Sequence, residues 1–170
     1  MLPDPNTHTA WSSPKLEKRA SPAGGYGMFA REYIPKDALL ALWGGYVITS
    51  AERDHLPEAA EHYTIQIDGD HHLTNGLLTS DADYFNHSCD PNAGLRGQIA
   101  LVARRDIQPN EEVCFDYAMS ESDPTFTMDC GCGHALCRRI VTGNDWKLSE
   151  LQTRYKGYFS SYIEQWINRA

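Results

Sequence analysis

The sequence predicts a mainly β domain of short strands and turns, followed by a helical tail. Residues 62–68 alternate apolar and polar side chains, a pattern typical of a strand with one buried face. Apolar segments at 39–49, 99–107 and 112–118 are short and are bounded by glycine, proline or asparagine turns. Because strands do not alternate with long helices, a parallel α/β sheet is not predicted, and a nucleotide-like cofactor is not expected on a Rossmann fold.

The composition indicates one globular domain with an acidic surface. The chain has 170 residues, of which 41% are hydrophobic, and its formal net charge is −8. No segment approaches the roughly 18 apolar residues that span a bilayer, and residues 1–13 lack the apolar block of a signal peptide. We therefore expect a soluble intracellular protein, cytoplasmic or nuclear depending on the organism, without membrane contact.

The charge pattern bears on possible partners. The basic residues form no stripe of the kind that binds nucleic acid, so direct nucleic-acid contact is not expected. An acidic surface suits a basic peptide as partner, but negative charge also serves solubility alone. The sequence leaves both interpretations open, and it does not indicate an oligomeric state.

The first half of the chain predicts an arm, a strand and a helix. Residues 1–22 are interrupted by four prolines and are expected to form an irregular arm. A glycine-rich turn at 24–27 leads into a short strand, and 39–49 predicts one or two strands bent at Gly44-Gly45. The spacing of Thr49 and Glu52 is that of a capping box, which predicts a helix over about 50–61.

The second half predicts one more short helix and a helical end. Ser80 is a candidate cap for a short helix through Tyr84 and Phe85. Residues 130–137 are too rich in glycine and cysteine for regular structure. Apolar side chains at helical spacing across 148–167 predict two short helices, or one helix kinked near Gly157.

The cysteines suggest a metal site. The pattern Cys-x-Cys-x4-Cys brings three thiols together on one tight loop, at Cys130, Cys132 and Cys137. Zinc takes four ligands in a tetrahedron, so a fourth must come from elsewhere. Cys89, Cys114 and His134 are the candidates. Cys114 lies in a predicted strand and is more simply a buried residue, whereas Cys89 lies in a loop that can present a ligand.

Five motifs in order resemble the SET-domain protein-lysine methyltransferases, and the resemblance covers about residues 23–142. The matching segments are Gly25–Ala30, Tyr33–Asp37 with Leu42–Gly45, Phe85–Asn92, Ala103–Tyr117, and Cys130–Arg138. The resemblance implies a SET fold of small curved sheets with knot-like C-terminal threading. It divides the chain into an arm (1–22), a SET domain (23–120), a post-SET zinc loop (121–142) and a helical tail (143–170).

Four positions depart from the family pattern. Asp83 stands where the family often has arginine, and Gly45 replaces a glutamate of the early strand. Asn110 and Arg139 stand where glycine is usual. None of these changes removes a residue expected to perform chemistry, but Asp83 and Arg139 bear on cofactor affinity and substrate choice.

The resemblance implies methyl transfer from S-adenosylmethionine to a lysine side chain. Tyr117 would be the catalytic tyrosine. Phe115 would lie in the lysine channel, at the position that sets how many methyl groups fit, and a phenylalanine there favours more than one. Tyr63 would form another channel wall, although a purely structural role is equally compatible with the sequence.

The resemblance also implies the binding residues. Asn86 and His87 would hold the cofactor, largely through backbone groups. The glycine motif would let the chain approach the cofactor closely and flank it, through Gly25, Tyr26, Gly27 and Met28. The implied zinc ligands are Cys89, Cys130, Cys132 and Cys137.

The implied substrate is a basic lysine-containing protein or peptide, either a histone or another protein. The alternative is a catalytically inactive, zinc-stabilised module that binds a peptide or a cofactor. The intact Tyr117 and the intact glycine motif favour the enzyme. The tail is expected to pack on the domain, although its aromatic stripe also suits a dimer or substrate surface.

Overall fold

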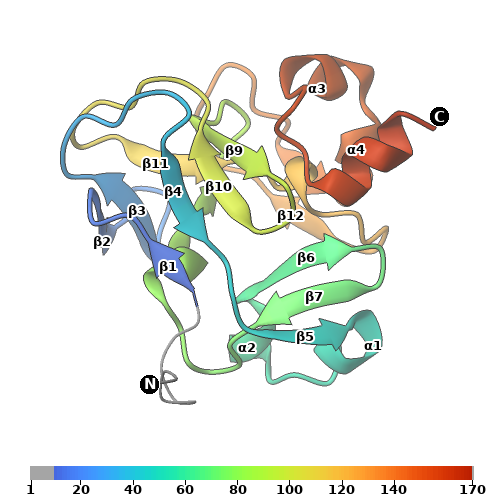
Figure 1. The fold of residues 1–170 in the computed structure, drawn as a ribbon. Coiled ribbons are helices and arrows are strands. Elements are labelled where there is room, and N and C mark those ends of the chain that lie inside the picture. The colour runs from blue at the N-terminus through green and yellow to red at the C-terminus, as the bar shows by residue number, and fades with distance from the viewer. Residues whose placement is uncertain (1–9, 170) are drawn as a thin grey trace.

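The protein folds into four small sheets with short helices around them (Figure 1). The computed structural model describes residues 10–169. The strands are β1 (Trp11–Ser12), β2 (Leu16–Ala20), β3 (Tyr26–Ala30), β4 (Leu39–Leu42), β5 (Tyr46–Thr49), β6 (Thr64–Asp68), β7 (His71–Thr74), β8 (Asn86–His87), β9 (Ala93–Arg96), β10 (Ala100–Ala103), β11 (Glu112–Phe115), β12 (Thr127–Asp129) and β13 (Ile140–Thr142). The helices are α1 (Ser50–Arg53), α2 (Glu58–Glu61), α3 (Ser149–Arg154) and α4 (Ser161–Ile167), with single 3-10 turns η1 (Asp81–Tyr84), η2 (Tyr117–Met119) and η3 (Asp145–Lys147). The predicted mainly β class is confirmed.

The sheet order brings late and early parts of the chain together. The strand orders are β1-β4-β10-β9, β2-β3-β11-β8, β5-β7-β6 and β12-β13. Strand β11 pairs antiparallel with β3 and parallel with β8. The end of β11 therefore lies beside Asn86–His87, although the paired residues are 28 positions apart along the chain. The knot-like threading that the resemblance implies stays a prediction.

The expectation of an irregular arm over 1–22 is wrong for two segments. Strand β2 forms a hairpin with β3, and β1 pairs with β4. Pro14 lies between these strands and Pro22 lies in the hairpin turn, so the prolines end the strands without preventing them. The part of this prediction that concerns residues 1–9 lies outside the described residues.

The helix expected over about 50–61 is divided into α1 and α2. The capping box is present: the Thr49 side chain accepts a hydrogen bond from the Glu52 backbone, and the Glu52 side chain accepts one from the Thr49 backbone. Pro57 occupies the cap position of α2. Because proline disfavours helical backbone in the residue before it, the helix cannot run through this point.

Strand β6 does not have the simple alternation that its sequence suggests. Gln66, expected on the polar face, is buried, whereas Ile67 is only partly buried. The Gln66 side chain donates to the Gly69 carbonyl at 3.3 Å and accepts from the Ser122 backbone N–H at 2.7 Å. These bonds offset the cost of burying the amide.

The tail forms the two helices predicted from its spacing, α3 and α4, separated near Gly157. Gly157 has φ of 81°, in the left-handed region that favours glycine. Five apolar side chains of the tail are buried in the main core, and Trp166 and Ile167 pack against it partly buried, whereas Leu148 is exposed: the five are Leu151, Tyr155, Phe159, Tyr162 and Ile163. In Figure 1 the two helices lie over the end of the molecule that also carries β6 and β12. The aromatic stripe of the tail is thus core packing.

Within residues 10–169, none of the helices combines the length and the apolar character needed to cross a bilayer.

Candidate functional site

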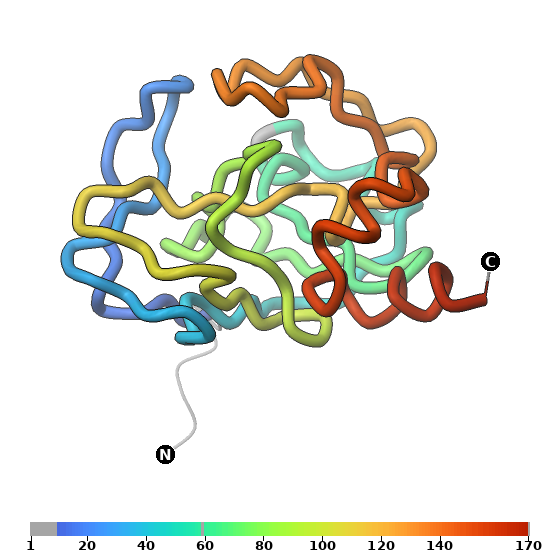
Figure 2. Tube along the Cα trace, turned by 90° about the horizontal axis from the view of Figure 1, so that it is seen from above, coloured from blue at the N-terminus to red at the C-terminus, as the bar shows by residue number. Residues whose placement is uncertain are grey.

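One large cavity, of about 590 Å³, lies between the sheets. It is bordered by the tip of the β2–β3 hairpin, the start of β6, the β8–β11 junction and the cysteine loop. Figure 2 shows the hairpin tip and the cysteine loop facing each other across the top of the molecule. Tyr117, Phe115 and Tyr63 all line this cavity, as do Asn86, His87, Cys130 and Cys132.

Tyr117 is held at the cavity wall by both its backbone and its side chain. Its backbone N–H donates to Nδ1 of His87 at 3.2 Å, and its hydroxyl lies 3.4 Å from the Phe85 carbonyl oxygen. The ring packs edge-on against the His87 ring, with 5.2 Å between centroids. Burial raises the pKa of the Tyr117 phenol, so the hydroxyl stays protonated at neutral pH and can donate a hydrogen bond.

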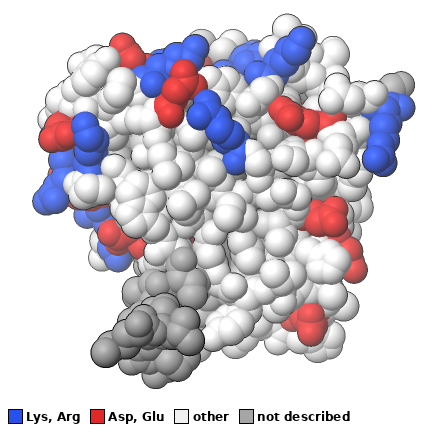
Figure 3. Space-filling model, in the orientation of Figure 1, with Lys and Arg blue, Asp and Glu red and all other residues white. Residues whose placement is uncertain are grey.

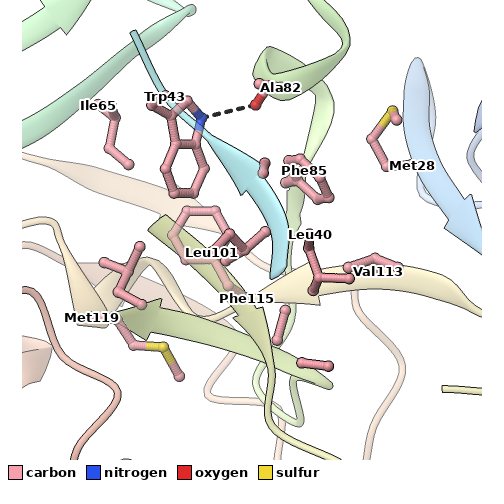
Figure 4. Packing of buried hydrophobic residues seen from close by; sticks show 14 of the residues in the cluster. Met28, Leu40, Trp43, Ile65, Ala82, Phe85, Leu101, Val113, Phe115 and Met119 are labelled. Atoms are coloured by element: carbon pink, nitrogen blue, oxygen red, sulfur yellow. Dashed lines mark hydrogen bonds between the residues drawn. The ribbon is translucent and has the colours of Figure 1, made fainter. Parts of the chain in front are cut away.

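Phe115 forms the apolar floor beside Tyr117. Its ring centroid lies 5.1 Å from that of Tyr117 and 5.6 Å from that of Trp43. The Trp43 indole N–H donates to the Ala82 carbonyl at 2.8 Å, which fixes the ring that Phe115 packs against (Figure 4). Phe115 is therefore backed by the core, so its side chain is rigid where it meets the cavity.

Tyr63 reaches the same cavity from the other side. It directly precedes β6, and its ring packs against Tyr84 at 5.6 Å between centroids. Tyr84 in turn packs against Tyr26 at 6.0 Å. Of these three tyrosines only Tyr63 lines the cavity, and its assignment to the lysine channel stays a prediction.

Asn86 links the segment Phe85–Asn92, called the signature loop below, to the glycine motif. Its side-chain amide donates to the Tyr26 carbonyl at 3.0 Å and to Oε1 of Glu112 at 2.7 Å. A Cβ atom at Gly27 would lie 2.1 Å from that Glu112 oxygen and 2.9 Å from the Asn86 amide nitrogen. Only glycine at position 27 leaves room for this arrangement. Glu112, which the sequence analysis did not single out, is the residue that joins the two motifs.

The glycine motif meets the cavity earlier in the chain than predicted. Ala23 and Gly24 line it, whereas Gly25 and Tyr26 do not belong to its lining. Gly24 has φ of 102° and Gly25 has φ of 65°, and a Cβ at either would meet no atom within 4 Å. The backbone of this turn is therefore open to a bound molecule. The Met28 side chain is fully buried in the core (Figure 4), and the expectation that Met28 flanks the cofactor stays a prediction.

His87 is a buried, neutral imidazole that supports its neighbours. Because Nδ1 accepts from the Tyr117 N–H, the proton is assigned to Nε2, which lies 3.3 Å from Sγ of Cys89. Burial lowers the pKa of His87 to about 4. With both ring nitrogens occupied, only the His87 backbone is left for a ligand in the cavity.

Four cysteine thiols converge next to the cavity. The sulfur atoms of Cys89, Cys130, Cys132 and Cys137 all lie within 4.8 Å of one another. A tetrahedron with zinc–sulfur bonds of about 2.3 Å has edges of roughly 3.8 Å, and Cys89 and Cys130 are 3.9 Å apart. Cys114 lies in β11 outside this group. The donor set and its spacing fit one zinc ion, with the fourth sulfur supplied by the signature loop.

Arg138 contacts the cysteine cluster through its backbone. Its N–H lies 3.4 Å from Sγ of Cys89, while its guanidinium forms a two-pronged ion pair with Asp116 at 2.6 and 2.7 Å. A further bond reaches Asp145 at 2.8 Å. Two buried carboxylates therefore bind the Arg138 side chain. Asp116, which was not singled out, is the centre of this network.

Two departures from the family pattern have a conformational explanation. Arg139 and Asn110, which stand where glycine is usual, have φ of 69° and 72°. Both residues therefore adopt left-handed backbone, which glycine adopts without strain and which asparagine tolerates better than most residues.

Asp83, the third departure, accepts hydrogen bonds from the backbone and hydroxyl of Ser80 and so caps η1.

The fold and the site define a mainly β domain in which a four-thiol cluster adjoins a cavity lined by a partly buried tyrosine. Comparison with known families identifies it: residues 25–118 match the SET domain, and the chain belongs to the SET domain family.

Two relatives are 25% and 30% identical to this chain over the segments that align. Histone-lysine N-methyltransferase ash1 of Drosophila melanogaster is 25% identical over 151 residues, which cover 82% of this chain and 7% of that protein. The H3 lysine-4 specific histone-lysine N-methyltransferase of Cryptococcus neoformans is 30% identical over 128 residues, covering 67% of this chain and 9% of that protein. The chain thus spans less than a tenth of the length of these relatives.

The fold is also similar to a solved structure. A crystal structure of KRYPTONITE in complex with mCHG DNA and SAH superposes with a TM-score of 0.59 and 25% sequence identity. The match covers 74% of this chain and 28% of that one.

Proposed function

We propose that this chain is an S-adenosylmethionine-dependent protein-lysine N-methyltransferase that adds more than one methyl group. The observation that carries the proposal is the pairing of the Tyr117 hydroxyl with the apolar Phe115 ring in the wall of one cavity. Membership of the SET domain family and the names of the relatives support the same activity. The catalytically inactive alternative is not favoured, because the tyrosine and the open glycine turn are both in place.

Charge and backbone geometry favour a basic, extended peptide as substrate. Among the described residues that line the cavity are five carboxylates, against the single guanidinium of Arg53: Glu58, Glu61, Asp83, Glu121 and Asp129. Strands β6 and β12 are edge strands that border the cavity, so their backbones can pair with a strand of another chain. The substrate class is a lysine in a basic segment, as in a histone tail or another protein.

The face of the molecule drawn in Figure 3 carries charges of both signs. In Figure 3, Lys and Arg side chains gather over the part of the surface formed by β2 and β3, and acidic side chains stand over the part formed by the β5-β7-β6 sheet. Several of the basic groups are paired with carboxylates, such as Lys15 with Glu32 and Arg96 with Asp37. The cavity, whose lining carries more carboxylates than guanidinium groups, is therefore where we expect a basic peptide to bind.

The reaction requires a neutral lysine amine, whose reference pKa is about 10.4. An apolar floor of Phe115 and Trp43 disfavours the ammonium form by desolvation. The protonated Tyr117 hydroxyl and the Phe85 carbonyl then fix the direction in which the amine points. S-adenosylmethionine supplies the methyl group. No carboxylate base is required beside the nitrogen, because positioning and desolvation provide the neutral nucleophile.

The residues proposed to hold the cofactor are the open turn at Gly24–Gly25 and the backbones of Asn86 and His87. The backbones are proposed because the side chains of these two residues are already engaged: the Asn86 amide and the His87 ring both bond within the protein. The SAH in the KRYPTONITE complex supports a cofactor of this kind. Zinc, held by the four cysteines, would stabilise the loop that closes one side of the cavity. All five cysteines are free thiols, which suits a reducing intracellular compartment.

Incubation with isotope-labelled S-adenosylmethionine and a library of lysine peptides tests the proposal. The library should include basic histone-like sequences and matched sequences in which acidic residues replace the basic ones. We expect label on lysine, with the basic peptides methylated faster. Mass spectrometry locates the site and counts the methyl groups. Binding of the cofactor without any transfer to lysine would contradict the proposal and favour the inactive module.

Phe115→Tyr is expected to shift the product toward monomethyl-lysine. Phe115 packs between Trp43 and Tyr117, so an added hydroxyl, and a water bound to it, would occupy room that a methylated amine needs. The wild type should place at least two methyl groups, whereas the variant should retain the first transfer. Mass spectra of an exhaustively methylated peptide measure the difference.

Phe126→Tyr is the matched control, because it adds the same hydroxyl at another position in the cavity lining. It should leave the product distribution unchanged. A wild type that yields only monomethyl-lysine would show that Phe115 does not set the limit.

A further inference from the structure

Tyr155, in the helical tail, lies at the junction between the signature loop and the catalytic segment. It directly follows α3, far beyond the residues that match the SET domain. Its side chain is fully buried. Its hydroxyl lies 2.9 Å from Oδ2 of Asp116 and 3.1 Å from the carbonyl oxygen of Cys89. One tail residue thus contacts both the residue before Tyr117 and a cysteine of the four-thiol cluster.

Asp116 connects Tyr155 to the catalytic tyrosine. This fully buried carboxylate caps η2, the 3-10 turn that begins with Tyr117, by accepting from the Ala118 N–H at 3.0 Å. It also accepts two bonds from the guanidinium of Arg138. A buried carboxylate requires a full set of donors, and the Tyr155 hydroxyl adds a further donor at Oδ2, beside Nη1 of Arg138.

The Tyr155 ring is itself fixed by the surrounding residues. The Arg104 guanidinium lies 4.7 Å from its centroid and donates to the carbonyl oxygens of Pro91 and Arg154. The tail makes further bonds to the same region, because the Ser160 N–H donates to the Met119 carbonyl at 2.8 Å. The hydroxyl position is therefore determined by the docking of the tail as a whole.

We propose that Tyr155 is a positioning residue for methyl transfer: its hydroxyl holds Asp116 against the signature loop and thereby orients Tyr117 in the cavity. This inference rests on the proposed methyltransferase function. The tail lies outside the residues that match the family, and the inference is that it helps to orient the catalytic tyrosine. Tyr155 acts only through Asp116, so it should affect the turnover rate more than the binding of the cofactor.

The test compares Tyr155→Phe with Tyr158→Phe. Tyr158 lies in the same tail, and its ring also packs on Arg104, at 5.2 Å, but its hydroxyl makes no hydrogen bond with any of the described residues. Tyr155→Phe should lower kcat about tenfold while leaving the KM for S-adenosylmethionine and the zinc content unchanged. Tyr158→Phe should leave all of these near the wild-type values.

Amide hydrogen exchange provides a readout that does not depend on activity. Tyr155→Phe should speed exchange at the Tyr117 and Ala118 amides, and Tyr158→Phe should not. Unchanged turnover and exchange in Tyr155→Phe would overturn the inference, as would an equal loss in the Tyr158→Phe control. If the wild type transfers no methyl group, the proposed function fails, and the exchange comparison still decides whether Tyr155 holds this segment.

Discussion

Tyr117→Phe is expected to slow methyl transfer by a factor of roughly 10² to 10³, with cofactor binding nearly intact. The substitution removes one hydroxyl and little volume, and the loss of a donor aimed at a reacting centre costs an amount of this order. The ring contacts with His87 and Phe115 remain, so the cavity wall should keep its shape. Single-turnover rates with a methylatable peptide, together with calorimetric binding of S-adenosylmethionine, measure the two effects separately.

Tyr63→Phe serves as the control for this experiment, because it removes a phenol hydroxyl from the same cavity. A much smaller effect at Tyr63 would assign the chemistry to Tyr117. Equal effects of the two variants would indicate that the hydroxyls act only by filling or polarising the cavity. Unchanged turnover in Tyr117→Phe would show that this residue is structural.

Cys132→Ser is expected to abolish zinc binding and, with it, most of the activity. The wild type should contain about one zinc per chain, as a closed four-thiolate site requires. Because Cys89 lies within the signature loop, loss of the metal should loosen both the cysteine loop and this loop, which carries Asn86 and His87. Metal analysis, thermal melting and methyl transfer measured on the same preparation test the three consequences.

Cys114→Ser is the matched control, since this cysteine lies outside the cluster and should leave the zinc content unchanged. Zinc binds thiolates, so protons compete with the metal, and acidification should release it from the wild type. Removal of zinc without any loss of melting temperature or of activity would contradict a structural role. Equal zinc loss in Cys114→Ser would contradict the assignment of the ligands.

Features that depend on neighbours along the chain could be predicted from the sequence. The Thr49–Glu52 capping box, the division of the tail near Gly157 and the three-cysteine loop all rest on interactions within a few residues. Their physical basis is local: backbone preferences, hydrogen bonds to the first helical turn, and the reach of a short loop. The order and spacing of the motifs likewise sufficed to suggest the family.

Contacts between distant segments could not be predicted in the same way. From spacing alone the fourth zinc ligand could be any of three residues. The fold places Cys89 at the cluster, 41 residues before Cys130. The burial of Met28 and the role of Glu112 depend on how β3 and β11 pair. A sequence pattern shows that a side chain is apolar, but it does not show whether the core or a cavity receives it.

The sequence by itself determined the mainly β class, the family and the residue types available for chemistry. Each of these depends only on composition, short-range periodicity and the order of the motifs. Only the tertiary structure decided which groups meet. Asp116 joins the catalytic segment, the cysteine loop and the tail through Arg138 and Tyr155, which follow it by 22 and 39 residues. A buried carboxylate takes whichever donors the packing of the whole chain brings to it, and that choice depends on contacts made across the fold.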